Sequence, residues 1–381
     1  MRIGIDTRYV SDHFPGIGRY VANLVRSLSR LDHPHTLVLL THPALPNTRH
    51  SLDALRSAPN IEWSPLPMAA RPFSLAEHLL IPRRCRVLRL DLLHSPYYLK
   101  PYAGLPCPSV VTIYDLIGRR FPSTLPARTR SLFNLATWLA LRTSAHVLTI
   151  SSSARDDIIT SYRVPETRLT VTHLAADQRF CPQPPEAIAA VRAAYHLPPR
   201  YVLYLGANKP HKNLERLVLA WAQLHEQPGQ PEACLVMAGH EDPRYSQARR
   251  IVAERGLSGT TRFLPNVNEA DLPGLYGGAD FFAFPSFYEG FGLPPLEAMA
   301  CGTPVLCANA SSLPEVVGDA ALLVNPSSVS DLASGLQTLL TNPLLRADLR
   351  QRGLQQAQTF SWERTARKTL AVYEAVGQRH C

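Results

Sequence analysis

The sequence predicts an α/β protein made of two doubly wound domains. The chain has 381 residues, which is more than one ordinary hydrophobic core organises. Short apolar runs typical of strands alternate with helical patterns along most of its length, and this alternation indicates parallel sheets covered by helices. The alternation is interrupted once, by proline clusters between residues 176 and 200, so we expect one domain on each side of that segment.

The expected elements follow in order along the chain. In the first half, strand-like runs lie at residues 3–5, 36–40, 110–113 and 147–150, and a helical pattern covers 20–31. In the second half, strand-like runs lie at 202–205, 235–238, 281–284 and 305–308, with helical patterns over 213–224 and 332–340. These runs are continuously apolar, as expected for strands that are buried on both faces.

The domain boundaries follow from the proline-rich segment. We expect a first domain over residues 1–180, a linker with one short helix over 181–200, and a second domain over 201–360. A last helical pattern, in residues 361–381, could belong to either domain.

The composition limits the class of protein. A hydrophobic content of 45% with 18% charged residues is typical of a soluble globular chain. No apolar run approaches the roughly 20 residues that a transmembrane helix needs, and no signal-peptide core is recognisable. Seven cysteines without a C-x-x-C pair indicate neither a zinc site nor a disulfide framework, so we expect a reducing, cytoplasmic setting.

The positive charge is unevenly distributed. Residues 1–180 hold 22 Lys and Arg against 12 Asp and Glu, a balance of +10, and the remaining residues have a balance of −1. This bias indicates an anionic partner, which could be a phosphate-bearing substrate, an acidic membrane surface or nucleic acid. Solubility alone is the alternative explanation, and no recognised nucleic-acid module is visible.

Two loops that follow strands could bind anions. Gly16 and Gly18 in "FPGIGRY" let backbone approach a ligand, and the following helix presents free amides, although a simple turn explains the spacing equally well. Lys209 and Lys212 in "LGANKPHKN" precede a second helix, where two ammonium groups beside free amides suit a diphosphate. A solvated loop is the alternative for these lysines.

A third loop, in "FPSFYEGFGLPPLEAMACGTPV", carries two carboxylates around a sharp bend. Glu289 lies in the loop that leaves a strand, and Glu297 lies in the first turns of the next helix. The amides of Phe291, Gly292 and Leu293 project from the N-terminus of that helix. Carboxylates that accept hydrogen bonds from hydroxyls, with an anion held between them, suit a sugar nucleotide.

The region 284–326 resembles the signature of glycosyltransferase family 4, whose E-x7-E motif is matched by Glu289 and Glu297. The likeness extends to "IGIDTRYV", "GIGRY", "DLLHSPYYL", "VVTIYDLIGRRFP", "VLTISSSARDDII", "YLGANKPHKNLERL", "FSWER" and "VYEAV", and so covers nearly the whole chain. It implies the GT-B architecture: two facing Rossmann-like domains, with the C-terminal helix crossing back to the first domain.

The resemblance also assigns roles in donor binding. Glu297 matches the glutamate that binds the ribose hydroxyls, and Glu289 matches the one near the donor sugar. Lys212 matches the diphosphate-binding lysine. The amides of residues 291–293 would hold sugar hydroxyls and diphosphate. Relatives often carry an arginine shortly before this lysine, where this chain has Ala207 and Asn208, so Lys209 would take its place.

The first domain departs from the family at one position. Many relatives have a histidine followed by an aspartate at the end of the strand in "VVTIYDL", and this chain has Tyr114 and Asp115. A tyrosine of ordinary pKa, about 10, cannot act as a base near neutral pH, but it can donate a hydrogen bond to a sugar hydroxyl. Asp115 could orient or deprotonate the acceptor, or it could cap a helix. His94 is expected to be structural.

The resemblance implies a retaining, metal-independent hexosyltransferase, with mannosyl as the favoured group. No cofactor is expected. The donor would be a nucleotide-diphosphate sugar bound by the second domain, and the acceptor a glycan or lipid-linked molecule met by the first. A front-face mechanism and a double displacement both remain open.

Basic and apolar residues mix in "IPRRCRVLRL" and over residues 118–142. This mixture suggests peripheral contact with the anionic inner face of the plasma membrane, and ordinary core helices with basic outer faces are the alternative. The alternative functions are a non-catalytic sugar-nucleotide-binding protein and, with less support, a nicotinamide-dependent oxidoreductase.

Overall fold

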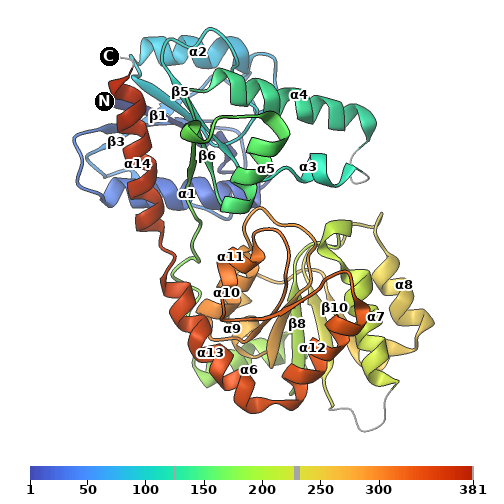
Figure 1. The fold of residues 1–381 in the computed structure, drawn as a ribbon. Coiled ribbons are helices and arrows are strands. Elements are labelled where there is room, and N and C mark those ends of the chain that lie inside the picture. The colour runs from blue at the N-terminus through green and yellow to red at the C-terminus, as the bar shows by residue number, and fades with distance from the viewer. Residues whose placement is uncertain (123–125, 227–231, 380–381) are drawn as a thin grey trace. The chain divides into compact units, whose positions relative to one another are not determined.

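The computed structural model describes residues 1–122, 126–226 and 232–379. The chain forms two compact units: Met1–Leu174 together with Ser361–Cys381 make unit 1, and Ala175–Phe360 make unit 2. Figure 1 shows a parallel sheet with covering helices in each unit, so the predicted α/β class is confirmed.

Unit 1 contains a seven-stranded parallel sheet in the order β3-β2-β1-β4-β5-β6-β7. Its inner strands are buried along almost their whole length because helices cover both faces. The strands are β1 Arg2–Asp6, β2 Thr36–Thr41, β3 Ile61–Pro65, β4 Leu92–Ser95, β5 Ser109–Ile113, β6 His146–Thr149 and β7 Leu169–Val171.

The face of the sheet that each helix covers depends on the direction in which the chain crosses from one strand to the next. The step from β1 to β2 runs one way across the sheet, and the steps from β3 to β4, β5 to β6 and β6 to β7 run the other way. Right-handed crossovers therefore place α1 on one face and α2, α4 and α5 on the other. The bounds are α1 Pro15–Arg30, α2 Glu77–Val87, α3 Ile117–Arg120, α4 Ala127–Thr143 and α5 Ser152–Tyr162.

Helix α1 begins earlier than expected. The sequence pattern predicted a start at residue 20, whereas the helix begins at Pro15, whose fixed φ suits a first helical position. Gly16 and Gly18, which we expected in a loop, consequently lie in the first turns of α1.

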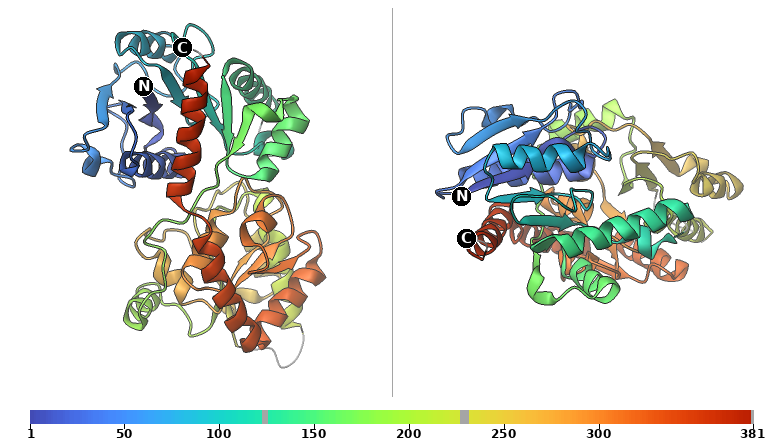
Figure 2. Two further views of the ribbon diagram at one scale, coloured as in Figure 1. Left: turned by 60° about the vertical axis from the view of Figure 1, so that its left-hand side comes forward. Right: turned by 90° about the horizontal axis from the view of Figure 1, so that it is seen from above.

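The C-terminal helix α14, Trp362–Gln378, belongs to unit 1 and packs against α1 (Figure 2). The Tyr373 hydroxyl lies 2.6 Å from His94 Nδ1, and Glu374 Oε1 lies 3.0 Å from His35 Nε2. The expectation that the last helix returns to the first domain is confirmed.

Unit 2 contains a six-stranded parallel sheet in the order β10-β9-β8-β11-β12-β13. The strands are β8 Tyr201–Leu205, β9 Cys234–Ala238, β10 Thr261–Leu264, β11 Phe281–Phe284, β12 Val305–Ala308 and β13 Leu322–Val324. The helices are α6 Pro185–Ala194, α7 Leu214–His225, α8 Gln247–Glu254, α9 Leu272–Gly277, α10 Leu293–Ala300, α11 Leu313–Val317, α12 Val329–Thr341 and α13 Pro343–Gln358.

The segment 181–200, expected as a linker, lies in unit 2. Its short helix α6 packs against α9, and Val191 on α6 is buried among the residues of the unit 2 core.

Each sheet has one point at which successive connections leave in opposite directions. In unit 1 this point lies between β1 and β4, and in unit 2 it lies between β8 and β11. Ligands of open α/β sheets bind beyond the carboxyl ends of the strands at such points, so the sheet order marks where a site is expected in each unit. Within the described ranges, no helix has the length and apolar character needed to cross a membrane.

Candidate functional site

The unit 2 site is built from three loops that leave the carboxyl ends of β8, β11 and β12. The loop after β8 carries Lys209 and Lys212, the loop after β11 carries Glu289, and the segment after β12 carries Ser311 and Ser312. Because β8 and β11 are neighbours at the switch point, the first two loops meet.

The Lys212 ammonium forms an ion pair with the Glu289 carboxylate. Lys212 Nζ lies 2.7 Å from Glu289 Oε1 and 2.9 Å from Oε2, and the two side chains are 16% and 11% exposed. The ammonium also lies 5.2 Å from the centre of the Phe284 ring. This fixed, largely dehydrated pair places one cation and one anion where a diphosphate and a sugar hydroxyl could reach them.

Two serines after β12 fix the backbone around Glu289. The Glu289 amide donates to Ser311 Oγ at 3.2 Å, and the Glu289 carbonyl accepts from Ser311 Oγ at 2.7 Å and from Ser312 Oγ at 2.9 Å. Ser312 Oγ also donates to the Phe291 carbonyl at 2.6 Å. Neither serine was predicted as part of the site.

The bend between the two glutamates requires a glycine. Gly292 has a φ of 123°, and a Cβ there would lie 2.9 Å from Leu313 Cδ2. The first bond of α10 runs from the Leu296 amide to the Gly292 carbonyl at 3.3 Å, and Pro294 and Pro295 have no amide proton to offer. The amides of Gly292 and Leu293 therefore take no part in the backbone hydrogen bonds of α10.

Glu297 lies on α10 and is only 2% exposed. Its carboxylate accepts a hydrogen bond from the Tyr276 hydroxyl at 3.3 Å. The carboxylate lies in the second turn of α10, and Gly292 is the N-cap residue of that helix.

Lys209 and its neighbour Asn208 have different surroundings. Lys209 is exposed directly before the short helical turn Pro210–Lys212. The Asn208 amide group is fully engaged: Nδ2 donates to the carbonyls of Asp242 at 2.9 Å and Tyr245 at 2.8 Å, and Oδ1 accepts from the Asp242 amide at 2.7 Å. The position at which relatives often carry an arginine is thus used here to hold the loop that follows β9.

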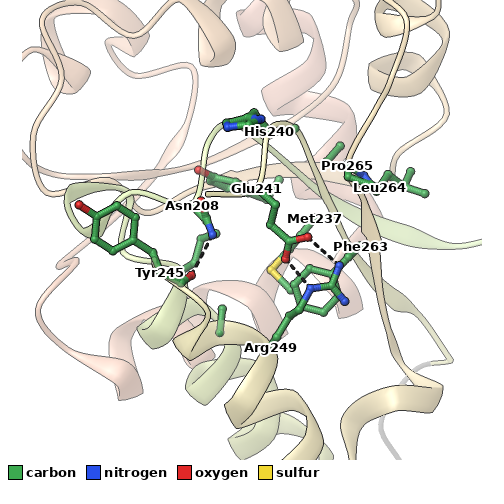
Figure 3. A pocket seen from close by; sticks show the side chains of 15 residues that line it. Asn208, Met237, His240, Glu241, Tyr245, Arg249, Phe263, Leu264 and Pro265 are labelled. Atoms are coloured by element: carbon green, nitrogen blue, oxygen red, sulfur yellow. Dashed lines mark hydrogen bonds and ion pairs between the residues drawn. The ribbon is translucent and has the colours of Figure 1, made fainter. Parts of the chain in front are cut away.

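A small hollow lies beside this loop, at the ends of β8, β9 and β10 (Figure 3). Arg249 Nη2 pairs with Glu241 Oε2 at 2.8 Å, and its guanidinium lies 4.0 Å from the centre of the Phe263 ring. The hollow holds about 20 Å³, which is room for one water molecule rather than a ligand.

Asn213 and His211 are further residues that the sequence analysis missed. Asn213 has a φ of 61°, and its Nδ2 donates to the Pro285 carbonyl at 3.0 Å and the Pro326 carbonyl at 2.8 Å. The carbonyl of the buried His211 accepts a hydrogen bond from the Phe287 amide. Burial, and then the positive charge of Lys212, lower the pKa of the His211 ring to about 4. An asparagine directly before a helix is a recognisable signal, but it indicates an N-cap rather than this bridge between loops.

In unit 1, Tyr114 and Asp115 follow β5. Tyr114 Oη is buried and has no hydrogen-bond partner within the described part of the chain. Burial, and then the phenols of Tyr20, Tyr97 and Tyr9, raise the pKa of Tyr114 well above 10. Asp115 Oδ1 accepts the Ile117 amide at 2.9 Å, but the N-cap residue of α3 is Leu116, so Asp115 fixes the turn before the helix rather than serving as its N-cap.

His94 is structural, as expected. Its Nε2 lies 2.8 Å from Thr112 Oγ1, and its Nδ1 contacts Tyr373 on α14. Burial lowers its pKa to about 3, so the ring stays neutral at any physiological pH.

Gly16 and Gly18 differ in their surroundings. A Cβ at Gly16 would meet nothing within 4 Å, whereas one at Gly18 would lie 3.1 Å from the Tyr9 carbonyl oxygen. The Gly18 amide donates to the Phe14 carbonyl at 2.7 Å and is therefore engaged within the helix. Gly18 thus serves close packing of α1 on the segment after β1.

Within residues 1–122, 126–226 and 232–379, no three His, Cys, Asp or Glu side chains gather in a way that could hold a metal ion.

Comparison with known proteins gives a consistent match to one family. Residues 192–356 match the model described as glycosyl transferases group 1, and residues 15–180 match the model described as glycosyltransferase family 4. The chain is 32% identical over 385 residues to O-antigen chain mannosyltransferase B of Escherichia coli, and the aligned region covers 98% of this chain and 100% of that protein. It is also 34% identical over 232 residues to an MMP alpha-(1->4)-mannosyltransferase of Mycolicibacterium hassiacum, covering 60% of this chain and 53% of that protein.

Solved structures share the fold. Sucrose-phosphate synthase from Thermosynechococcus elongatus superposes with a TM-score of 0.75 at 22% identity, covering 99% of both chains. HepE from Anabaena, solved with UDP and glucose, gives a TM-score of 0.75 at 18% identity over 98% of this chain and 100% of that one. The predicted GT-B class is confirmed by these neighbours.

Proposed function

Because the chain belongs to the group 1 glycosyl transferases, within glycosyltransferase family 4, we propose that it transfers a mannosyl group from a nucleotide-diphosphate sugar to a glycan or lipid-linked acceptor. The transfer retains the anomeric configuration and needs no metal. It serves the synthesis of a cell-surface polysaccharide or glycolipid. The preference for mannose rests on the names of the similar curated proteins.

The observation that carries this proposal is the arrangement of Lys212, Glu289 and the α10 N-terminus at the switch point of unit 2. The Lys212 ammonium lies in the loop after β8, and the amides of Gly292 and Leu293 lie at the N-terminus of α10, so the unit offers two kinds of donor to an anion. Charge that develops on the departing diphosphate is stabilised by such preorganised donors. Lys209, which is exposed in the same loop as Lys212, adds a second cation when the donor is bound.

The two glutamates take separate parts in this proposal. Glu289, held by Lys212 and by the serines after β12, accepts a hydrogen bond from a hydroxyl of the donor sugar. Glu297, which is buried and in contact with Tyr276, accepts the ribose hydroxyls. In unit 1, Tyr114 and Asp115 meet the acceptor at the end of β5. Gly16 lies in the first turn of α1, where its amide is proposed to bind an anion.

A peripheral membrane contact at the inner face of the plasma membrane is part of the proposal. Helix α4 exposes three large apolar side chains: Leu132 is 58% exposed, Leu135 is 53% and Trp138 is 43%. Arg128 and Arg142 are exposed near its two ends, and Arg142 lies 5.8 Å from the centre of a Trp138 ring. An apolar stripe flanked by arginines fits the interface of an anionic bilayer.

A thermal-shift screen with GDP, UDP, ADP and dTDP, followed by a turnover assay with the matching sugar nucleotide, tests the function. A nucleotide that binds only the native state raises stability by RT ln(1 + [L]/Kd), and GDP is expected to give the largest shift. Binding without turnover in the presence of mannosylated acceptors would favour the non-catalytic sugar-nucleotide-binding alternative.

A further inference from the structure

Five aromatic side chains contact one another at the carboxyl edge of the unit 1 sheet in a cluster that we call the aromatic shelf: Tyr9, His13, Phe14, Phe73 and Tyr97. Phe14 lies at its centre, with ring centres 4.5 Å from His13, 5.1 Å from Tyr9, 5.5 Å from Phe73 and 6.4 Å from Tyr97. Tyr9 is fully buried at the base, whereas His13 and Phe73 are exposed at the rim.

The shelf is assembled at the switch point of this sheet. Its residues come from the segments that follow β1, β3 and β4, and β1 and β4 are the strands from which successive connections diverge. Three chain segments that are distant in sequence thus converge where an open α/β sheet binds its ligand.

Phe73 is held in a conformation that its side chain disfavours. It has a φ of 69°, in the left-handed region that a bulky side chain rarely adopts, and it is nevertheless 52% exposed. The burial of its ring does not explain this conformation, because half of the ring faces solvent. Strain that persists at an exposed aromatic residue points to a role in binding.

A buried ionic network below the shelf fixes the loop that carries Phe73. Arg8 Nη1 donates to the Ala70 carbonyl at 2.7 Å and to Glu77 Oε2 at 2.9 Å, and Arg8 Nη2 donates to Asp6 Oδ2 at 2.6 Å. The Glu77 carboxylate in turn accepts the Phe73 amide. The loop therefore presents Phe73 without having to be ordered by a ligand.

Three hydroxyl groups near the shelf lack an internal partner. Ser11 Oγ, Ser95 Oγ and Tyr114 Oη are buried and form no hydrogen bond with any described residue. Ser11 lies between Tyr9 and Phe14 in the chain, Ser95 ends β4 two residues before Tyr97, and the Tyr114 ring packs on Tyr20 with centres 5.3 Å apart. Buried hydroxyls normally have partners, so these three leave hydrogen-bonding capacity unused in this part of unit 1.

The chemistry of this surface selects a neutral, hydroxylated ligand. A pyranose has a C–H face that packs on aromatic rings and a rim of hydroxyls that exchange hydrogen bonds. A phosphate finds little attraction here, because the Arg8 guanidinium is committed to Asp6, Glu77 and the Ala70 carbonyl. Asp115, whose carboxylate helps to raise the pKa of Tyr97 and Tyr98, adds a negative charge nearby.

We propose that the aromatic shelf binds a sugar residue of the acceptor, so that the acceptor is a neutral glycan recognised through its pyranose ring rather than through a phosphate or a lipid. This inference rests on the proposed glycosyltransferase function only in assigning the bound sugar to the acceptor. The binding of a pyranose can be measured without turnover.

The test is saturation-transfer NMR of the full-length protein with mannotriose, together with the acceptor KM where transfer is observed. Phe73→Ala is expected to weaken mannotriose binding and raise the acceptor KM by about tenfold or more, while the GDP-induced thermal shift stays unchanged. Phe73→Trp should retain binding. Leu75→Ala is the matched control, because Leu75 lies in the same loop, is 89% exposed and is aliphatic.

Phe73→Gly separates binding from folding. Glycine adopts the left-handed conformation without strain, so this variant should fold with an unchanged or higher melting temperature and still lose mannotriose binding.

The proposal is overturned if Phe73→Ala and Phe73→Gly bind mannotriose as the unchanged protein does. It is equally overturned if both variants and Leu75→Ala lose sedimentation with anionic vesicles but keep mannotriose binding, because the loop would then dock on lipid. Mannotriose binding without any transfer would support the shelf and count against the proposed function instead.

Discussion

At the scale of single residues, the Lys212–Glu289 pair joins the two parts of the unit 2 site. The partners are 77 residues apart in sequence and meet only because β8 and β11 are neighbours. Removing one partner leaves the other charge poorly solvated, and such a loss is costly even where the intact pair contributes little net stability. Variants at this pair therefore need a stability control.

Glu289 and Glu297 should respond differently to substitution. Glu289→Gln should keep nucleotide affinity and lower turnover by about 10²-fold or more, because it removes a charge that acts near the reacting sugar. Glu297→Ala should weaken nucleotide binding by about 1.5–3 kcal/mol, the usual contribution of a hydrogen bond to a charged group.

Calorimetric titration with GDP and steady-state kinetics measure these two effects. Tyr276→Phe is the control for Glu297, since it removes only the hydroxyl that lies 3.3 Å from the carboxylate. Equal losses of affinity at both glutamates would contradict the separate roles.

Lys100 gives a prediction about pH. Its ammonium is fully buried, lies 2.6 Å from Ser109 Oγ and 2.8 Å from Ser144 Oγ, and burial lowers its pKa from 10.5 to about 7. Between those two pH values the unfolded chain binds more protons at this residue than the folded chain does. The contribution of Lys100 to stability therefore rises with pH across this window and is lost as the pH falls towards 7.

Chemical denaturation of the Lys100→Met variant and the unchanged protein at pH 7 and about pH 9.5 tests this linkage. The variant should lack a stability increase on the order of 3 kcal/mol that the unchanged protein gains between the two pH values. Parallel dependence on pH in both proteins would show that Lys100 does not titrate in this range.

At the scale of secondary structure, four of the five strands missing from our expected elements lie at sheet edges, and the fifth, β4, lies inside the unit 1 sheet. Both edge strands of each sheet, β3 and β7 in unit 1 and β10 and β13 in unit 2, were absent from our expectation. Their residues are mostly only partly buried, whereas the inner strands are buried throughout. Polar residues interrupt β3, β7 and β10, so a search for continuous apolar runs passes over these three strands.

The C-terminal helix depends on one buried hydrogen bond to unit 1. Tyr373→Phe should destabilise the protein by about 1–3 kcal/mol, because it leaves the buried His94 Nδ1 without its partner at 2.6 Å. Glu374→Gln is a matched control on the next residue. Its contact with His35 involves a carboxylate that is 44% exposed, and it should change stability by less than about 0.5 kcal/mol.

Thermal unfolding of both variants measures this difference. If Tyr373→Phe melts at the same temperature as Glu374→Gln, the buried contact does not hold the helix in place.

At the scale of the whole molecule, the excess positive charge and the exposed apolar residues of α4 fall in the same unit. Sedimentation with anionic vesicles should therefore be strong at low salt and weaken as salt screens the arginines. Leu135→Asp should reduce this binding by about tenfold or more, since it places a charge in the apolar stripe. Leu344→Asp, on α13 of unit 2, alters a residue that is 82% exposed and serves as the control.

Equal sedimentation of the unchanged protein and Leu135→Asp would argue against membrane contact through α4. Absence of binding at every salt concentration would remove the membrane from the proposal altogether.

The sequence by itself determined the α/β class, the inner strands of both sheets except β4, and the E-x7-E segment around Gly292. These features are local, because burial on both faces, helix starts and glycine turns are encoded by neighbouring residues. Only the tertiary structure decided which side chains meet. The pairing of Lys212 with Glu289, the bridge from Asn213 to Pro285 and Pro326, and the contact of Tyr373 with His94 across 279 residues all depend on strand order and on helix docking. Strand order is set by long-range packing and not by any local pattern, and the aromatic shelf, drawn from three separate segments, appears only once that order is known.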